Sequence, residues 1–162
     1  MPPTPAEEVA SAARQRLIDR AIRLGATEHD WDRAEEQLSA RSDVMPAPGD
    51  VYWMVTEALV AEALARSEWR SVSALYRDQA RYFAETGQPW RSLRREAELA
   101  GLWDLKANGF VKRVQLLTKG CCPACEVLNG TVVTVAGELA GPSIPAPDCD
   151  ASWCLCVSAP VI

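Results

Sequence analysis

The sequence predicts a mostly α-helical chain, built from antiparallel helical hairpins, that ends in a small β element. Three observations lead to this prediction. Apolar residues recur at three- and four-residue steps through most of the first 109 residues, which is the spacing of one helix face. The pattern changes at Phe110, where β-branched runs typical of strands begin. All six cysteines lie between Cys121 and Cys156, near the C-terminal end of the chain.

Two helices are predicted in the N-terminal segment, residues 1–41. Thr4 has the form of a capping box at the start of the first helix, over about residues 5–24. The second helix is expected over about residues 28–41, with acidic residues in its first turn. Prolines and a glycine between residues 42 and 50 interrupt the helical pattern, which predicts a linker there.

Three further helices are predicted in residues 51–109. They cover about residues 51–66, 68–86 and 89–107, and each has an apolar face. Asp50 is expected to cap the first of them, because its carboxylate can accept from the free N–H groups of a helix start. Helices separated by such short connections are expected to pack as antiparallel neighbours.

Small and aromatic residues in this segment are spaced as in a known helical repeat. They are Ala74, Leu75, Tyr76, Ala80, Tyr82, Phe83, Glu85, Gly87, Ala97 and Leu99. The pattern resembles the tetratricopeptide family, in which such residues let paired antiparallel helices nest. The resemblance implies one helical pair, with residues 51–66 as a half-repeat. An ordinary helix bundle is the alternative interpretation, and it also predicts antiparallel helices.

A strand followed by a hairpin is predicted after the helices. Residues 110–117 are rich in apolar and β-branched side chains and are expected to form the strand. Asn129-Gly130 separates the apolar residues 127–128 from a β-rich run over residues 131–135. Asn-Gly between two such runs is a strong hairpin signal, because a type I′ turn needs positive φ at both central residues.

The remainder of this element is expected to be a loop and one short strand. Glycines and prolines between residues 137 and 150 predict the loop. Residues 154–157 are interpreted as a last strand. Pro160 is expected to stop that strand, because proline has no N–H for the ladder.

A metal site is predicted where the strand meets the cysteines. Cys122 and Cys125 form a C-x-x-C pair, the arrangement that commonly supplies two ligands of a structural zinc site. The second pair comes from another segment brought in by the fold. Because the only histidine, His29, lies far away in a helical segment, an all-cysteine site in a zinc knuckle is expected.

Three later cysteines can complete this site, namely Cys149, Cys154 and Cys156. Alternate residues of a strand point to opposite faces, so Cys154 and Cys156 need a bend to bind one ion together. Cys149 is therefore expected to join one of them. The preferred set is Cys122, Cys125, Cys149 and Cys154, and the choice between Cys154 and Cys156 stays open. Cys121 is expected to be a free thiol.

A closed four-cysteine site points to structural zinc, because a catalytic site keeps one coordination position open. Disulfides and uncoordinated thiols are the alternatives.

The predicted organisation is a helical hairpin (1–41), a linker (42–50), a tetratricopeptide-like body (51–109) and a cysteine-rich zinc-binding β element (110–162).

The cysteine-rich tail also has a layout known from another family. The matching residues are Cys122, Cys125, Leu128, Gly130, Cys154 and Cys156. This order resembles the C-terminal element of phage head-morphogenesis (minor capsid) proteins, which ends in His-Pro-x-Cys-Arg-Cys. Here Cys149 stands in for the histidine at a different spacing, and Leu155 replaces the arginine. The layout is also similar to that of small uncharacterised bacterial proteins with a helical front and a cysteine tail, and it supports a metal site.

The net charge of −5 is unevenly distributed along the chain. Residues 1–65 carry a net −6, residues 66–119 a net +5 and residues 120–162 a net −4. The densest basic series is Arg91, Arg94, Arg95, Lys106, Lys112, Arg113 and Lys119. A polyanion would be attracted there, although basic residues on a solvated helix face give the same pattern.

The sequence favours a non-enzymatic protein-interaction or scaffolding module, stabilised by a structural four-cysteine zinc site, with an unidentified protein partner. No Ser/His/Asp set, paired-carboxylate signature or glycine-rich phosphate loop is visible. Nucleic-acid binding through residues 91–119 is the first alternative. The second is a thiol redox protein, because Cys122-Pro123-Ala124-Cys125 resembles the C-P-x-C motif of glutaredoxins.

Six tryptophans are available for a binding surface or for the core. They are Trp31, Trp53, Trp69, Trp90, Trp103 and Trp153. Trp53, Trp69 and Trp153 are the ones expected to be exposed, and Trp153 is placed to cover the metal.

Length and hydropathy suggest about one domain with a real core, and they suggest no membrane association. No apolar run approaches the roughly 18 residues of a membrane span. The first residues lack a basic region followed by an apolar one, so no secretory signal is recognised and a cytoplasmic location is expected. In that reducing compartment, clustered cysteines more often bind metal than form disulfides.

Overall fold

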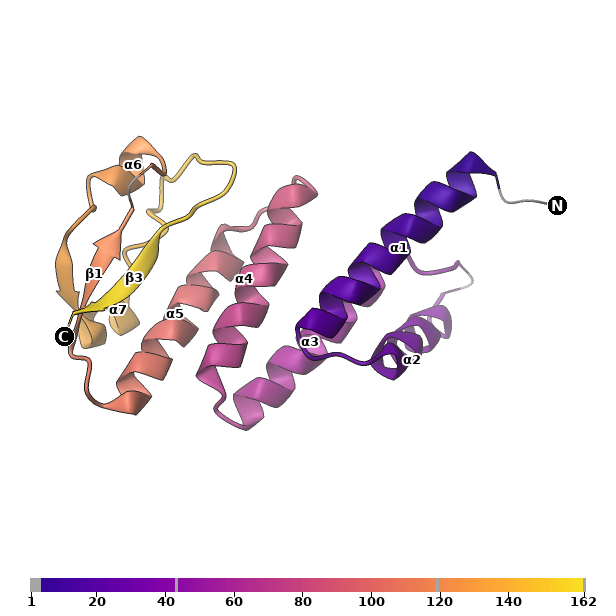
Figure 1. The fold of residues 1–162 in the computed structure, drawn as a ribbon, viewed down its shortest axis with the longest axis horizontal. Helices are drawn as coiled ribbons and strands as arrows, with labels where there is room; N and C mark the ends of the chain where they lie inside the picture. Colours follow the sequence, from indigo (N-terminus) through magenta and orange to yellow (C-terminus); the bar gives the residue numbers. More distant parts are fainter. Residues whose placement is uncertain (1–3, 43, 119, 162) are drawn as a thin grey trace. The chain divides into compact units, whose positions relative to one another are not determined.

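A computed structural model describes residues 4–42, 44–118 and 120–161. The described residues are mostly helical, with a three-stranded antiparallel sheet near the C-terminus (Figure 1). The chain divides into two compact units, Met1–Glu62 and Ala63–Ile162, and the boundary falls within a helix. Among the described residues, no helix combines the length and the apolar character needed to cross a membrane.

The N-terminal unit consists of helices, two of which begin at capping boxes. These are α1 (Pro5–Arg23), α2 (Glu28–Ser39) and most of α3 (Pro48–Ala65). Thr4 and Thr27 are the N-caps of α1 and α2, and in each case the side chain accepts from the N–H three residues later. This reciprocal pattern satisfies two of the free N–H groups at a helix start, so these starts follow from local sequence.

Aromatic side chains form the buried centre of this unit. Trp31 and Tyr52 have almost no exposed surface. An ion pair joins α1 to α2, because Arg14 Nη2 lies 2.7 Å from Glu35 Oε2. The same guanidinium lies 5.8 Å from the Trp31 ring centroid, and that of Arg20 lies 5.6 Å from the Tyr52 ring. Cationic side chains of α1 therefore cover both buried rings.

The predicted linker is shorter than residues 42–50, because α3 begins at Pro48. Proline is accepted in the first turn of a helix, where its missing N–H would have had no partner. The carbonyl of Ala47 accepts from the N–H of Asp50 at 2.9 Å, so Asp50 lies inside the first turn and does not cap the helix. Asp43 lies outside the described residues.

Two long antiparallel helices lie in the C-terminal unit. They are α4 (Trp69–Glu85) and α5 (Arg91–Asn108), and Figure 1 shows them side by side. The Ser73 hydroxyl on α4 donates to the Ala97 carbonyl of α5 at 2.7 Å. Gly109 ends α5 with φ of +74°, a conformation that favours glycine. The prediction of antiparallel helices is confirmed for this pair.

The sheet lies beside α5 (Figure 1) and has the strand order β2-β1-β3. β1 (Arg113–Leu117) is central and pairs antiparallel with β2 (Val132–Thr134) and β3 (Val157–Val161). Val114 and Leu116 of β1 are fully buried, and Val114 packs with apolar residues of α5. The alternation of buried and exposed residues along β1 gives the sheet an inner face and an outer face.

The predicted Asn-Gly hairpin is wrong in its pairing. β2 pairs with β1, and residues 127–128 form no strand. Gly130 does have positive φ, at +80°, and its N–H donates to the Leu116 carbonyl at 2.8 Å. Asn129 accepts from the Thr118 N–H through its side-chain oxygen at 3.0 Å. The Asn-Gly pair therefore closes the long connection between β1 and β2, a tertiary role that local turn signals do not distinguish from a hairpin.

Two other predictions in this region need correction. A short helix, α7 (Val135–Ala140), occupies the start of the predicted loop, and Thr134 caps it by accepting from the Gly137 N–H at 3.0 Å. The last strand begins at Val157, not at residue 154. Pro160 lies within this strand, because β3 is at the edge of the sheet, where a missing N–H is tolerated.

Candidate metal centre

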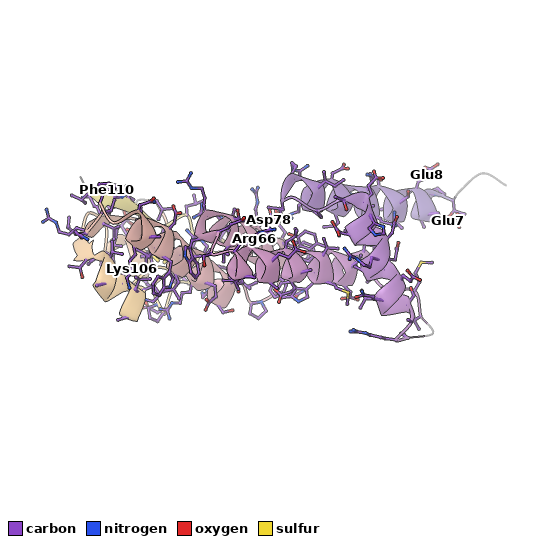
Figure 2. All side chains as sticks on the ribbon, turned by 90° about the horizontal axis from the view of Figure 1, so that it is seen from below. Glu7, Glu8, Arg66, Asp78, Lys106 and Phe110 are labelled. Carbon is purple, nitrogen blue, oxygen red and sulfur yellow. The ribbon has the colours of Figure 1, made fainter. Side chains whose placement is uncertain are left out.

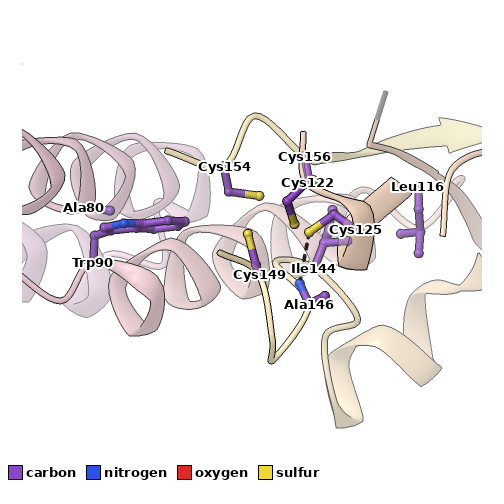
Figure 3. Packing of buried hydrophobic residues seen from close by; sticks show 10 residues of the cluster. All are labelled: Ala80, Trp90, Leu116, Cys122, Cys125, Ile144, Ala146, Cys149, Cys154 and Cys156. Atoms are coloured by element: carbon purple, nitrogen blue, oxygen red, sulfur yellow. Dashed lines mark hydrogen bonds between the residues drawn. The ribbon is translucent and has the colours of Figure 1, made fainter. Parts of the chain in front are cut away.

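The fold brings all six cysteines together from three segments. They come from the turn after β1, from the loop after α7 and from the residues before β3. Five are almost completely buried and Cys121 is half-buried, and all six are free thiols. Figure 3 shows the thiols of Cys122, Cys125, Cys149 and Cys154 pointing toward one another. Figure 2 shows the side chains of the described residues on the ribbon of Figure 1, turned by 90°.

The first segment forms a short helical turn that places two thiols close together. Helix α6 (Pro123–Glu126) follows Cys122 directly, and Pro123 occupies its first position. The N–H groups of Cys125 and Glu126 donate to the Cys122 carbonyl at 3.1 and 2.9 Å. Because proline is favoured at a helix start, the C-P-x-C sequence itself favours this turn.

The loop that carries Cys149 is fixed by hydrogen bonds at both ends. The Ala146 N–H donates to Cys125 Sγ at 3.4 Å (Figure 3). The Cys149 N–H donates to the Ala146 carbonyl at 3.0 Å. Arg91, at the start of α5, donates from Nε to the Cys149 carbonyl at 2.6 Å. The loop therefore connects the cysteine cluster to α5.

A buried arginine holds the third segment. Arg94 of α5 donates from Nη2 to the Cys156 carbonyl and from Nη1 to the Glu98 carboxylate. Glu98 also accepts from the Ser158 N–H at 3.3 Å, through its second oxygen. Both charged side chains are almost fully buried. This ion pair and its contacts with the backbone hold the residues around the start of β3 in place.

Four of the thiols are close enough to bind one metal ion. The sulfur atoms of Cys121, Cys125, Cys149 and Cys154 all lie within 4.8 Å of one another. The sulfurs of Cys121 and Cys154 are 3.5 Å apart. Around tetrahedral zinc with Zn–S bonds of about 2.3 Å, neighbouring sulfurs are roughly 3.8 Å apart. This geometry is compatible with a structural zinc site.

The structure differs from the preferred ligand set in one respect. Cys121, expected to be a free thiol, belongs to the close group, and Cys122 does not. The thiols of Cys122 and Cys156 nevertheless interact with that of Cys125, so all five predicted ligands lie in one cluster. The C-x-x-C spacing selects Cys122, and no signal in the sequence adds its neighbour Cys121 to the close group.

The cluster is buried enough to shift thiol pKa values in both directions. Burial raises the pKa of Cys125 to about 11 and that of Cys149 to about 12. Burial also acts on Cys122, but hydrogen bonds from the backbone of Cys125 and Asp150 and from the Cys149 thiol outweigh it and lower the pKa to about 7. Burial raises the pKa of Cys154 to about 11.

A lowered thiol pKa beside a buried partner is also found in redox C-x-x-C motifs. Redox catalysis, however, needs an accessible thiol, and Cys122 is only 4% exposed. Burial of Cys122 therefore argues against its use as a redox nucleophile.

Two tryptophans lie against this cluster. Trp90 is buried, Trp153 is half-buried, and their ring centroids are 5.5 Å apart. Both pack against the cysteine core, so the expected position of Trp153 over the cluster is confirmed. The prediction of exposed tryptophans is wrong, because Trp53 and Trp69 are half-buried while Trp103 is 39% exposed.

The basic series predicted for nucleic acid does not form one free surface. Arg94 is buried and Arg91 contacts the Cys149 carbonyl, so both contribute to the cysteine cluster. Lys106, Lys112 and Arg113 are exposed, and Lys106 Nζ lies 4.4 Å from the Trp103 ring centroid. Lys119 lies outside the described residues.

Comparison of the chain with models of protein families, with curated proteins and with solved structures found no match. The resemblances to the tetratricopeptide and phage head-morphogenesis families therefore stay predictions.

Proposed function

We propose that the chain is a non-enzymatic interaction module whose C-terminal unit is stabilised by structural zinc bound to its cysteines. The observation that carries this proposal is the convergence of buried thiols from three separate segments, four of them mutually within 4.8 Å. Because the ligands are thiolates in a closed, apolar site, the ion would have no open position for a substrate. Its contribution is then to hold the three segments together.

Zinc binding would supply most of the stability of this region. The sheet is small, and the connections between its strands are long and irregular. Apparent binding free energies of structural zinc sites are on the order of 10 kcal/mol at neutral pH, and this energy becomes folding energy when the free ligands are unstructured. Removal of the ion should therefore unfold the region from β1 to β3.

Metal analysis of a matched pair of variants tests this proposal. Cys149→Ser should lose zinc and should melt at a much lower temperature in its C-terminal unit. Leu155→Ser is the control, because Leu155 lies between two cysteines but is 67% exposed and has no sulfur. It should keep both the zinc and the wild-type melting temperature. A wild-type chain without bound metal, or a Cys149→Ser variant that melts like the wild type, would contradict the proposal.

We propose further that a protein partner binds the outer face of the sheet. Leu117 and Val132 are 42% and 46% exposed on this face. Val157 lies directly opposite Leu117, and Ala159 and Val161 follow on the same side of β3. Directly opposite residues of antiparallel strands share a face, so these apolar side chains lie on one side of the sheet, with Gln115 between Val132 and Ala159. Exposed apolar side chains gathered on one face are typical of interaction sites.

Charge introduced into this face tests the docking proposal. In affinity purification, a Leu117→Glu, Val132→Glu double variant should no longer retain the proteins that the wild type binds. It should keep its zinc. Val127→Glu is the control, because Val127 is 80% exposed but lies outside the sheet. Equal retention by the double variant and the wild type would remove this face as the docking site.

A further inference from the structure

We propose that Cys121 and Cys154 form a site of thiol oxidation, at which a hydroperoxide joins the two sulfurs in a disulfide and so releases the zinc. This inference rests on the proposed zinc site and adds the regulation of that site. Three observations support it. They are the distance between the two sulfurs, the exposure of Cys121 and the irregular backbone on which both residues lie.

The sulfurs of Cys121 and Cys154 lie close enough to be joined by a small movement. They are 3.5 Å apart, and both residues carry free thiols. A disulfide bond is about 2.05 Å long, so the two sulfurs need to approach each other by roughly 1.5 Å. Both belong to the group whose sulfurs all lie within 4.8 Å of one another. Two sulfurs that would bind the ion can therefore also bond to each other.

Cys121 is the member of this pair that solvent reaches. It is half-buried, whereas the other five cysteines are almost completely buried, and Cys154 is only 1% exposed. Gly120, directly before Cys121, is exposed. The susceptibility of a thiol to oxidation follows its exposure and its thiolate character. Among the six sulfurs of the cluster, a dissolved oxidant should therefore reach that of Cys121 first.

The backbone at both residues can accommodate the movement. Neither Cys121 nor Cys154 lies in a helix or a strand. The N–H of Cys121 donates to the Thr118 carbonyl at 3.1 Å in a turn where Gly120 has φ of +75°. Cys125, in contrast, lies within α6. The two irregular segments can shift by this distance without breaking a helical or a ladder hydrogen bond.

The oxidation is a two-electron step. The Cys121 thiolate attacks one oxygen of hydrogen peroxide, the O–O bond breaks, and the products are a sulfenic acid and hydroxide. The Cys154 thiolate then attacks the sulfenic sulfur, the S–O bond breaks, and a second hydroxide leaves. Each sulfur loses one electron, and the peroxide is reduced to two hydroxide ions.

The disulfide removes two of the four ligands in the close group. A metal ligand must be a thiolate, which a disulfide sulfur no longer is. Cys122 and Cys156 belong to the same buried core but lie outside the group within 4.8 Å, so they do not replace the lost ligands without a rearrangement. Because the ion would hold three segments together, the folded tail and its docking face would exist only in the reduced chain.

Peroxide treatment of the reduced, zinc-bound, full-length chain tests this inference. A coloured chelator would report the released zinc. After alkylation of the remaining thiols, peptide mass spectrometry would map the disulfide. We expect one zinc ion released for each Cys121–Cys154 disulfide, and zinc binding restored by reduction.

The alternative results separate this inference from the proposed zinc site. A first disulfide between Cys122 and Cys125, or a Cys121–Cys154 disulfide in a chain that keeps its zinc, would overturn the inference and leave the zinc site standing. Zinc loss with sulfinic acid at Cys121 and no disulfide would do the same. A chain that binds no zinc before treatment would overturn the zinc site and the release from it.

A ligand-preserving variant sharpens the result. Cys121→His keeps a nitrogen ligand for zinc but cannot form the disulfide, so peroxide should release its zinc at least several-fold more slowly. Leu155→Ser is the matched control, because Leu155 is 67% exposed beside Cys154, and it should release zinc as the wild type does. Equal release from Cys121→His and the wild type would overturn the inference. The disulfide map of the wild type decides the question even if the histidine variant does not fold.

Discussion

The two units of this chain are built from similar helices but have different kinds of core. In the N-terminal unit, Trp31 and Tyr52 are buried under cationic side chains of α1, and capping boxes define the helix starts. In the C-terminal unit, one of the core clusters contains five buried cysteines, contributed by separate segments, together with Trp90, Leu116 and Ile144. Local sequence signals therefore define the helix starts of the first unit, whereas the core of the second brings together residues from separate segments.

This difference predicts which changes affect which unit. A change at the cysteine cluster should destabilise the C-terminal unit and leave the N-terminal unit intact. A change at a helix cap should do the reverse. Three substitutions test this separation away from the cysteines themselves, and they are ordered here from the largest expected effect to the smallest.

The largest of these effects is expected from Arg94→Met. The substitution removes the nearest cation from the buried Glu98 carboxylate, which keeps only Arg77 at 3.8 Å, and it removes a donor from the Cys156 carbonyl. Breaking a buried ion pair from one side costs about 3–5 kcal/mol. Chemical denaturation should show this loss in the C-terminal unit only. An Arg94→Met, Glu98→Met double variant should recover much of it, and a double variant that is less stable than the single one would contradict this account.

A smaller effect is expected from Trp153→Ala, on the rate at which zinc is lost. Trp153 packs beside Trp90 against the cysteine core, so its removal gives water and chelator easier access. Transfer of zinc to a coloured chelator should accelerate at least several-fold. Trp53→Ala is the control, because Trp53 is also half-buried but belongs to the N-terminal unit. Equal acceleration in both variants would show that the two units are not independent.

The smallest effect is expected from Thr27→Ala, which removes the cap of α2. Loss of an N-cap side chain costs about 1 kcal/mol, here in the N-terminal unit alone. Thr27 hydrogen bonds also lower the pKa of Asp30 below its usual 3.8. A carboxylate with a lowered folded-state pKa stabilises the fold above its unfolded pKa, and this contribution is lost as pH falls through the folded value.

The stability difference between the wild type and Thr27→Ala should therefore shrink below about pH 4. Urea denaturation at neutral and acidic pH measures it. A pH-independent difference would contradict the role assigned to Asp30, and faster zinc loss from this variant would contradict the separation of the units.

The helices could be predicted from the sequence because their signals are local. Capping boxes at Thr4 and Thr27, together with apolar periodicity, place helix ends close to the observed ones. The start of α3 was missed because Pro48 was interpreted as a break, although proline also fits a first turn. A residue such as Pro48, which fits both a helix break and a helix start, is assigned correctly only when the packing of the chain is known.

The tail was harder to predict because its partners are distant in sequence. Asn129-Gly130 was assigned to a local hairpin, but β2 pairs with β1 across a long connection. The cysteine cluster itself was predicted, since clustered thiols need a chemical reason. The place of Cys121 within it was not, because the C-x-x-C spacing points to its neighbour Cys122 instead. Arg94 was assigned to a basic surface, and its burial depends on the chain returning to Cys156.

Hydrogen exchange with and without zinc tests the central claim most directly. Amide exchange would be followed by mass spectrometry in the intact chain, before and after removal of metal under reducing conditions. If zinc holds the tail together, the segments between β1 and β3 lose protection when the ion is removed, while α1 and α2 exchange as before. Unchanged protection in the tail, or equal loss in both units, would contradict the claim that a metal-bound sulfur core specifies only the C-terminal unit.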